Sequence, residues 1–213
     1  KIEPGSIASE IGLRPGDLVE KVNSEDINDQ VDFRFYTAEE DIELLVRRGN
    51  EQFVFEIEKD FNEDIGVELQ EMKMKACGNN CIFCFVYQNP KGMRKALYFK
   101  DEDYRFSFLY GHYVTLTTLK QKDLDRIVKQ RLSPLYISVH STEKTTRKLL
   151  LGTSREDHLL EKIEFLTSNG IELHAQIVLC PGINDGKIFD QTVADLRKFY
   201  PDVKSIAAVP VGL

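Results

Sequence analysis

The sequence predicts an α/β protein in which a small β-rich N-terminal domain precedes a partial barrel of strand–helix units, truncated after about five strands. Three observations lead to this fold class. Short alternating strands and tight turns fill the first third of the chain, and strands alternating with amphipathic helices fill the rest. Several later strands also carry a polar face, which fully covered parallel strands usually lack. We expect one domain at residues 1–63 and a second at residues 64–213.

The N-terminal domain is predicted from a hairpin and from turn residues. Apolar residues alternate with polar ones over residues 42–46 and again over residues 53–57, and an Arg-Arg-Gly-Asn turn separates the two runs. A further strand is expected at residues 18–23, directly after an Arg-Pro-Gly-Asp turn. The run from Pro4 to Val19 resembles the signature of bacterial PDZ domains, so we expect a PDZ-like domain here.

The second domain is predicted from the alternation of strands with helices. We expect parallel strands at residues 65–70, 113–117, 135–140, 171–179 and 203–211. Apolar residues recur at helical spacing over residues 124–132, 159–166 and 193–200, before the last three strands. Polar residues that alternate along the middle strands are expected to line a cavity, or else to hydrogen-bond inside a filled barrel. Because the last strand leaves an open sheet edge, we expect a sixth unit to follow in a longer protein.

Three of the four cysteines lie within eight residues of one another, with the spacing CxxxCxxC. One loop can therefore bring the thiolates of Cys77, Cys81 and Cys84 to one face of a cubane iron–sulfur cluster. Three protein ligands leave one iron open, and an open iron can bind S-adenosylmethionine and pass an electron to its sulfonium. A structural zinc site and an electron-carrying ferredoxin normally use four protein ligands, so both alternatives rank lower.

The motif, with the aromatic Phe83 before its last cysteine and a predicted strand just ahead of it, resembles that of the radical S-adenosylmethionine superfamily. Residues 85–94 and 98–105 are similar to a bacterial family that joins a PDZ-like domain, a radical enzyme and a C-terminal domain of unassigned function. The resemblance covers essentially the whole chain. It implies a [4Fe–4S] cluster, S-adenosylmethionine, a partial (βα)6 TIM-like barrel and an oxidoreductase-like enzyme, and it leaves the substrate unidentified. An electron donor such as a flavodoxin or ferredoxin is the expected partner.

The resemblance also implies contacts to S-adenosylmethionine, beginning with the aromatic Phe83 in the cysteine motif. The amino-group contact falls by position on Thr117 and Thr118, where the usual glycine-rich run ending in Glu is absent. Polar residues of later strands are expected to contact the ribose or the methionine carboxylate, and backbone of the fifth strand the adenine. These further residues are Ser138, His140, Gln176 and Val209. Cys180 is expected only to pack as a small buried residue.

Composition and charge argue against some classes of binding partner. A formal net charge of -7 opposes binding to a nucleic acid, and no apolar run is long enough to cross a membrane. Clustered cysteines suit a reducing compartment, so a cytoplasmic protein is expected. The competing function is that of a scaffold or interaction protein, which binds its partners through the PDZ-like domain and uses its metal site only to hold a loop in place. Because residues 1–3 leave little room for a carboxylate-binding loop, we expect the PDZ-like domain to meet a protein partner or the barrel, but not free C-termini.

Overall fold

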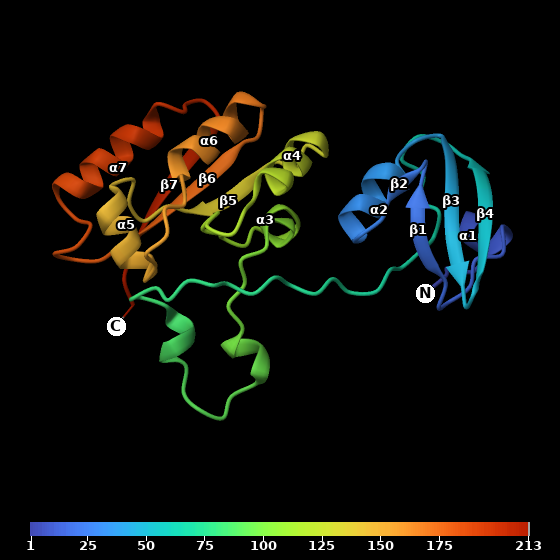
Figure 1. Cartoon of the computed structure of the whole chain (residues 1–213), viewed down its shortest axis with the longest axis horizontal. Coiled ribbons are helices and arrows are strands. Elements are labelled where there is room, and N and C mark those ends of the chain that lie inside the picture. Colours follow the sequence, from blue (N-terminus) through green and yellow to red (C-terminus); the bar gives the residue numbers. More distant parts are fainter. Residues whose placement is uncertain (213) are drawn as a thin grey trace. The chain divides into compact units, whose positions relative to one another are not determined.

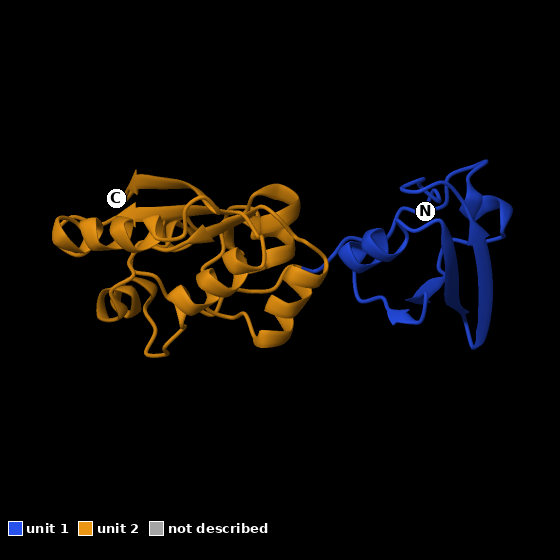
Figure 2. Cartoon of the chain, turned by 90° about the horizontal axis from the view of Figure 1, so that it is seen from above, with its two compact units in different colours: residues 1–73 blue, residues 74–213 orange. Residues whose placement is uncertain are grey.

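The computed structural model of the chain describes residues 1–212 (Figure 1). The chain divides into two units, Lys1–Lys73 and Met74–Leu213 (Figure 2). The sequence placed this division between residues 63 and 64, and the structure assigns the intervening segment to the N-terminal unit. The first unit contains an antiparallel sheet and the second a parallel one. No helix of the described chain is both long and apolar enough to cross a lipid bilayer.

The N-terminal unit is built on a four-stranded sheet with the strand order β2-β1-β3-β4. Its strands are β1 (Leu18–Val22), β2 (Glu25–Asp26), β3 (Asp41–Arg48) and β4 (Glu51–Glu58). Its helices are α1 (Ile7–Glu10) and α2 (Gln30–Tyr36). The predicted hairpin is the β3–β4 pair, in which alternate residues of β3 are buried because one face of the sheet covers the core.

Residues 64–70 pack in the N-terminal unit, so the first parallel strand expected at residues 65–70 is wrong. Ile65 lies in the core of this unit, and Val67 forms an antiparallel bridge with Ile2. Gly66 adopts a φ of +79°, and a Cβ added there would meet the Ser6 side chain at 2.2 Å. Alternating apolar residues fit any half-buried strand. The pattern therefore could not show that the pairing partner lies at the start of the chain.

A groove in this unit lies between α2 and the chain that follows β4. Its cavity of about 320 Å³ is lined by Phe33 and Thr37 on one side and by Val67 and Leu69 on the other. The segment opposite α2 therefore comes from late in the unit. The expectation that free C-termini are not captured stays a prediction.

The C-terminal unit contains a three-stranded parallel sheet with the order β5-β6-β7. Its strands are β5 (Leu135–Ser138), β6 (Leu173–Leu179) and β7 (Val203–Pro210). All three were predicted, but the strand expected at residues 113–117 is reduced to one parallel bridge between Val114 and Ile137. In the described residues this sheet has three of the five expected parallel strands, and it does not form a complete barrel. Beyond Val114, polar side chains take the backbone hydrogen bonds that a neighbouring strand would otherwise make.

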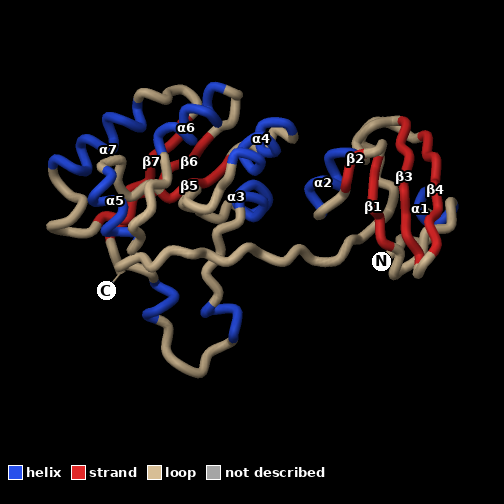
Figure 3. The backbone as a smooth tube through the Cα atoms, viewed as in Figure 1, coloured by secondary structure: helices blue, strands red, loops and turns tan. Residues whose placement is uncertain are grey.

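Helices separate the strands of this sheet, and a long irregular segment precedes them. The helices are α3 (Tyr104–Tyr110), α4 (Gln121–Lys129), α5 (Lys144–Leu151), α6 (Leu159–Ser168) and α7 (Lys187–Arg197). The predicted apolar face of α6 is buried at Ile163 and Leu166, as is that of α4 at Ile127. Between β4 and α3 the only helical turns are two 3₁₀ turns, η1 (Phe85–Gln88) and η2 (Lys95–Tyr98), as Figure 3 shows. The cysteine motif lies in this segment.

Candidate functional site

Cys77, Cys81 and Cys84 lie on one loop that leads into η1, and all three thiols are free and partly exposed. Burial, together with the neighbouring thiols of Cys77 and Cys84, raises the pKa of Cys81 to about 12. Burial also raises the pKa of Cys77. The thiols of Cys77 and Cys84 therefore lie close enough to Cys81 to disfavour its thiolate. Such a loop needs a positive partner, such as a metal centre, before all three thiols can ionise.

The C-terminal end of α5 supports the cysteine loop. The amide of Asn80 donates to the Leu151 carbonyl at 2.9 Å, and that of Ile82 donates to the Leu150 carbonyl at 3.0 Å. Two more carbonyl groups at the end of α5 accept hydrogen bonds from the amides of Gly152 and of the residue after it. The last four carbonyl groups of the helix, which have no partner within the helix, are therefore all hydrogen-bonded. Gly152 has a φ of +59°, and a Cβ there would lie 2.1 Å from the Asn80 carbonyl oxygen. Only glycine lets the loop approach this closely.

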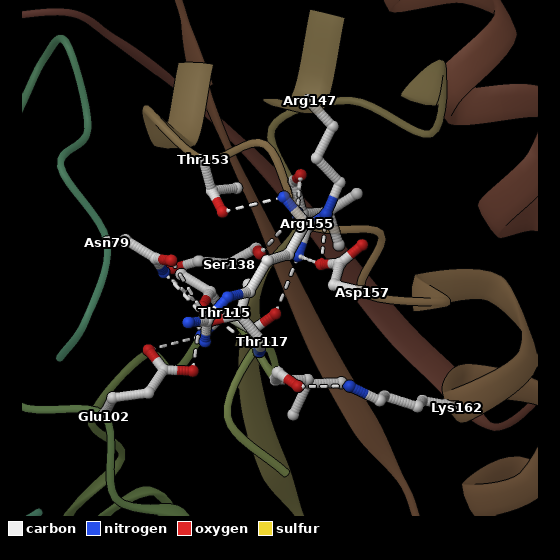
Figure 4. Close-up of polar contacts among 12 residues, drawn as sticks. Asn79, Glu102, Thr115, Thr117, Ser138, Arg147, Thr153, Arg155, Asp157 and Lys162 are labelled. Atoms are coloured by element: carbon white, nitrogen blue, oxygen red, sulfur yellow. Dashed lines mark hydrogen bonds and ion pairs between the residues drawn. The ribbon is translucent and has the colours of Figure 1, made fainter. Parts of the chain in front are cut away.

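A buried polar network supports the loop from the other side (Figure 4). The side-chain Nδ2 of Asn79 donates to the hydroxyl oxygens of Thr115 and Thr117, at 2.9 and 3.0 Å. The Thr115 hydroxyl donates to Glu102 Oε1 at 2.8 Å, and the Thr115 amide donates to Oε2 at 3.0 Å. Glu102 is only 3% exposed, and burial raises its pKa. The cysteine loop is thus tied to the chain that was expected to form the second strand.

Two cations bind the backbone at the carboxyl ends of the strands. Arg147, on α5 and 3% exposed, donates to the carbonyls of Thr115 and Ser138 at 2.7 and 3.2 Å, and also to the Val139 carbonyl. Its guanidinium also pairs with Asp157 at 2.6 Å. Lys162 on α6 donates to the Leu116 carbonyl at 2.7 Å, and burial lowers the pKa of this lysine. Figure 4 shows these side chains converging on the same strand ends.

His140 lies just beyond β5 and contacts the cysteine loop through Phe83, whose ring centroid is 4.7 Å away in an edge-on arrangement. Burial lowers the pKa of His140 to about 3, so the imidazole is neutral at pH 7. Its Nδ1 accepts a hydrogen bond from the Val178 amide at 3.1 Å, which leaves the proton on Nε2. Asn184 donates to the carbonyls of His140 and Val178 and thereby holds the ends of β5 and β6 together.

The remaining predicted site residues are distributed around this region. Ser138 is buried at the end of β5, in register with the half-buried Gln176 of β6. Val209 lies near the end of β7, opposite Val178, whose amide binds His140. Thr118 is exposed and lies outside the polar network, whereas Thr117 is part of it. Cys180 is buried, which agrees with a packing role.

The sequence patterns did not identify four residues of the site: Asn79, Glu102, Arg147 and Lys162. Asn79 could have been suspected, because it lies inside the cysteine motif and asparagine readily bonds to nearby backbone and side chains. The other three are charged residues in segments that look solvent-exposed. Their burial depends on tertiary contacts with the strand ends, for which the sequence carries no local signal.

Three cysteine thiols on one loop are the donors that this site offers to an iron–sulfur cluster. Within residues 1–212, no three His, Cys, Asp or Glu side chains are gathered tightly enough to hold one metal ion. A cubane cluster separates its thiolate ligands more widely, because each thiolate binds a different iron. Three thiols on one loop therefore fit the open, three-cysteine type of cluster.

Comparisons with known proteins identify the family of the chain. A family model described as a Radical SAM-like domain matches residues 59–206, which is more than half of the chain. A second model, described as a PDZ domain, matches residues 1–48. No curated protein matches the chain. The predicted combination of a PDZ-like domain with a radical S-adenosylmethionine domain is confirmed, and the chain belongs to the Radical SAM-like domain family.

Proposed function

We propose that the protein is a radical S-adenosylmethionine enzyme in which Cys77, Cys81 and Cys84 hold a [4Fe–4S] cluster. The observation that carries the proposal is the set of three free, partly exposed thiols on one loop, which α5 and the Asn79 side chain hold in place. When bound, such a cluster supplies an electron that cleaves S-adenosylmethionine to a 5′-deoxyadenosyl radical and methionine. The substrate of that radical is left open.

The residues at the strand ends are suited to bind the methionine and adenosine parts. Because His140 is neutral and its Nδ1 is engaged, it offers an Nε2–H donor beside Phe83. Thr117 offers a hydroxyl next to the cysteine loop. We assign the other contacts to Thr118, Ser138, Gln176 and the backbone near Val209. Ligands commonly bind at the carboxyl ends of parallel strands, which is where most of these residues lie.

The wider proposal includes a barrel and partners. The parallel strands and the bridge at Val114 support a partial TIM-like barrel. An electron donor such as a flavodoxin or ferredoxin would reduce the cluster. The groove beside α2 supports a protein partner for the PDZ unit. Four free cysteines suit the reducing cytoplasm.

Anaerobic reconstitution with iron and sulfide tests the proposal. The parent protein should bind four irons per chain, change its spectrum when S-adenosylmethionine is added and, once reduced, release 5′-deoxyadenosine and methionine. Cys77→Ala, Cys81→Ala and Cys84→Ala should each lose the stable cluster and both products. Cys180→Ala is the matched control and should keep them, because this cysteine is buried and lies outside the CxxxCxxC loop.

Two results would contradict the proposal. A fully loaded parent that shows no spectral response to S-adenosylmethionine and no cleavage would exclude the radical enzyme. Tight zinc binding without iron incorporation would favour the scaffold with a structural metal.

A further inference from the structure

We propose that Asn79 is a positioning residue whose backbone N–H, held in place by the Glu102–Thr115 pair, hydrogen-bonds the Cys77 sulfur and sets the reduction potential of the cluster. The inference rests on the proposed function of the cysteine loop. It goes beyond that function by assigning a role to three residues that are not expected ligands.

Every polar group of Asn79 is engaged. Its backbone N–H donates to Cys77 Sγ at 3.4 Å, and its carbonyl accepts from Lys100 Nζ at 2.8 Å. Its side-chain Nδ2 donates to Thr115 and Thr117, and its Oδ1 accepts from the Thr117 hydroxyl at 3.3 Å. The side chain is 6% exposed. A residue bound at all of these points has little freedom to turn, so its N–H stays directed at the sulfur.

The direction of these hydrogen bonds follows from Glu102. A carboxylate only accepts, and a hydroxyl has a single hydrogen. The Thr115 hydroxyl therefore donates to Glu102, and its oxygen can only accept from Asn79. This requirement selects an amide, whose NH₂ donates to both threonine hydroxyls and whose oxygen accepts from Thr117. An aspartate at this position would place a carboxylate oxygen against the hydroxyl oxygen of Thr115, so that two hydrogen-bond acceptors would face each other.

The chemical consequence concerns the sulfur of Cys77. A hydrogen bond from an N–H to a ligand sulfur stabilises the more negative, reduced cluster, and such bonds are among the factors that set cluster potentials. Losing the bond should therefore lower the reduction potential. Lys100, which binds the Asn79 carbonyl, adds a positive charge on the same side of the loop. The network thus favours acceptance of the electron that starts the reaction.

The test compares Asn79→Asp and Thr115→Val with Asn80→Asp. Asn80→Asp introduces the same charge at the adjacent, exposed position and is the matched control. In the reconstituted proteins, Thr115→Val should lower the one-electron reduction equilibrium about tenfold, a shift of ~59 mV, without any change of charge. Asn79→Asp should lower the reduction potential more than Asn80→Asp does.

A second measurement needs no cluster. In the apoprotein, amide hydrogen exchange at Asn79 should be slow in the parent and in Asn80→Asp. It should be at least about tenfold faster in Thr115→Val and Asn79→Asp, because the side chain no longer holds the backbone in place. Circular dichroism of each variant shows whether the fold is retained.

The two measurements separate this inference from the proposed function. If the parent binds no cluster, the proposed function fails, and the exchange rates alone decide whether the network holds Asn79. If the cluster forms but Thr115→Val matches the parent in potential and in exchange, the inference is wrong while the proposed function stands. Equal shifts in Asn79→Asp and Asn80→Asp would also overturn it, because charge alone would then explain them.

Discussion

Both units of the chain bury an apolar core, but they differ in the polar side chains that they bury. In the N-terminal unit the core around Leu44 and Val46 is apolar, with both residues fully buried. In the C-terminal unit, charged and polar groups lie buried at the carboxyl ends of the strands, with Glu102, His140 and Arg147 each 3% exposed. Burying a charge is costly unless it is paired and hydrogen-bonded. The comparison indicates that one unit uses burial mainly for stability, whereas the other uses it to hold a site.

The pairing in the C-terminal unit is complete within the described residues. No buried side-chain nitrogen or oxygen of residues 1–212 lacks a hydrogen-bond partner. The polar network is therefore already assembled in the protein alone. A site of this kind is pre-organised, so little of the binding free energy is used to order it.

The largest effect is expected from removing the central cation of that network. Arg147→Met should lower the free energy of unfolding of the C-terminal unit by about 3–5 kcal/mol, because it leaves Asp157 and several strand carbonyls without their partner. Urea denaturation followed by circular dichroism measures the loss. Arg155→Met, at an exposed position of the same segment, should cost less than about 0.5 kcal/mol. Equal losses in the two variants would show that the buried cation does not stabilise the unit.

Shortening a core side chain tests whether apolar burial stabilises the N-terminal unit. Leu44→Ala should destabilise the N-terminal unit by about 3 kcal/mol, because it removes apolar burial and leaves a cavity. Val54→Ala, at an exposed position of β4, is the control and should have little effect. Hydrogen exchange should accelerate in β3 but not in β6. Acceleration in both strands would mean that the two units unfold as one.

The smallest effect is expected from a surface ion pair of the N-terminal unit. Arg48 donates to both oxygens of Asp17 at 2.7 Å, and this hydrogen bonding lowers the pKa of Asp17. The pair should contribute about 1 kcal/mol above the unfolded-state pKa near 4, and the contribution should vanish as pH falls through the lower folded-state pKa. Asp17→Asn should therefore destabilise at pH 6 but not at pH 2. A pH-independent difference would contradict the electrostatic account.

Much of the fold was predictable because local patterns determine it. The β3–β4 hairpin, the apolar face of α6 and the strands β5 to β7 follow from residue periodicity and turn residues. The segments at 65–70 and 113–117 were not placed correctly. Both carry strand-like alternation, but their hydrogen-bond partners are Ile2 in one case and side chains such as Glu102 in the other. Periodicity reports which face is buried, not what the backbone pairs with.

The site was predictable only where chemistry requires a fixed spacing. The cysteine spacing identifies the loop directly, because three thiolates have to reach one cluster. Glu102 and Arg147 are close to the loop only because the fold brings α5 and the segment before α3 to the same strand ends. Gly152 is a comparable case, since its role depends on the approach of Asn80.

The support of the cysteine loop by α5 has a consequence for how the protein is made. The amides of Asn80 and Ile82 bond to carbonyls that come much later in the chain, at Leu150 and Leu151. A ribosome that has just added Cys84 must therefore continue to Gly152 before the loop can close, which takes on the order of several seconds at usual rates of synthesis. During that interval the thiols are unsupported and open to oxidation or to a wrong metal. The loop that would hold the proposed cluster is therefore complete only after translation has passed the end of α5.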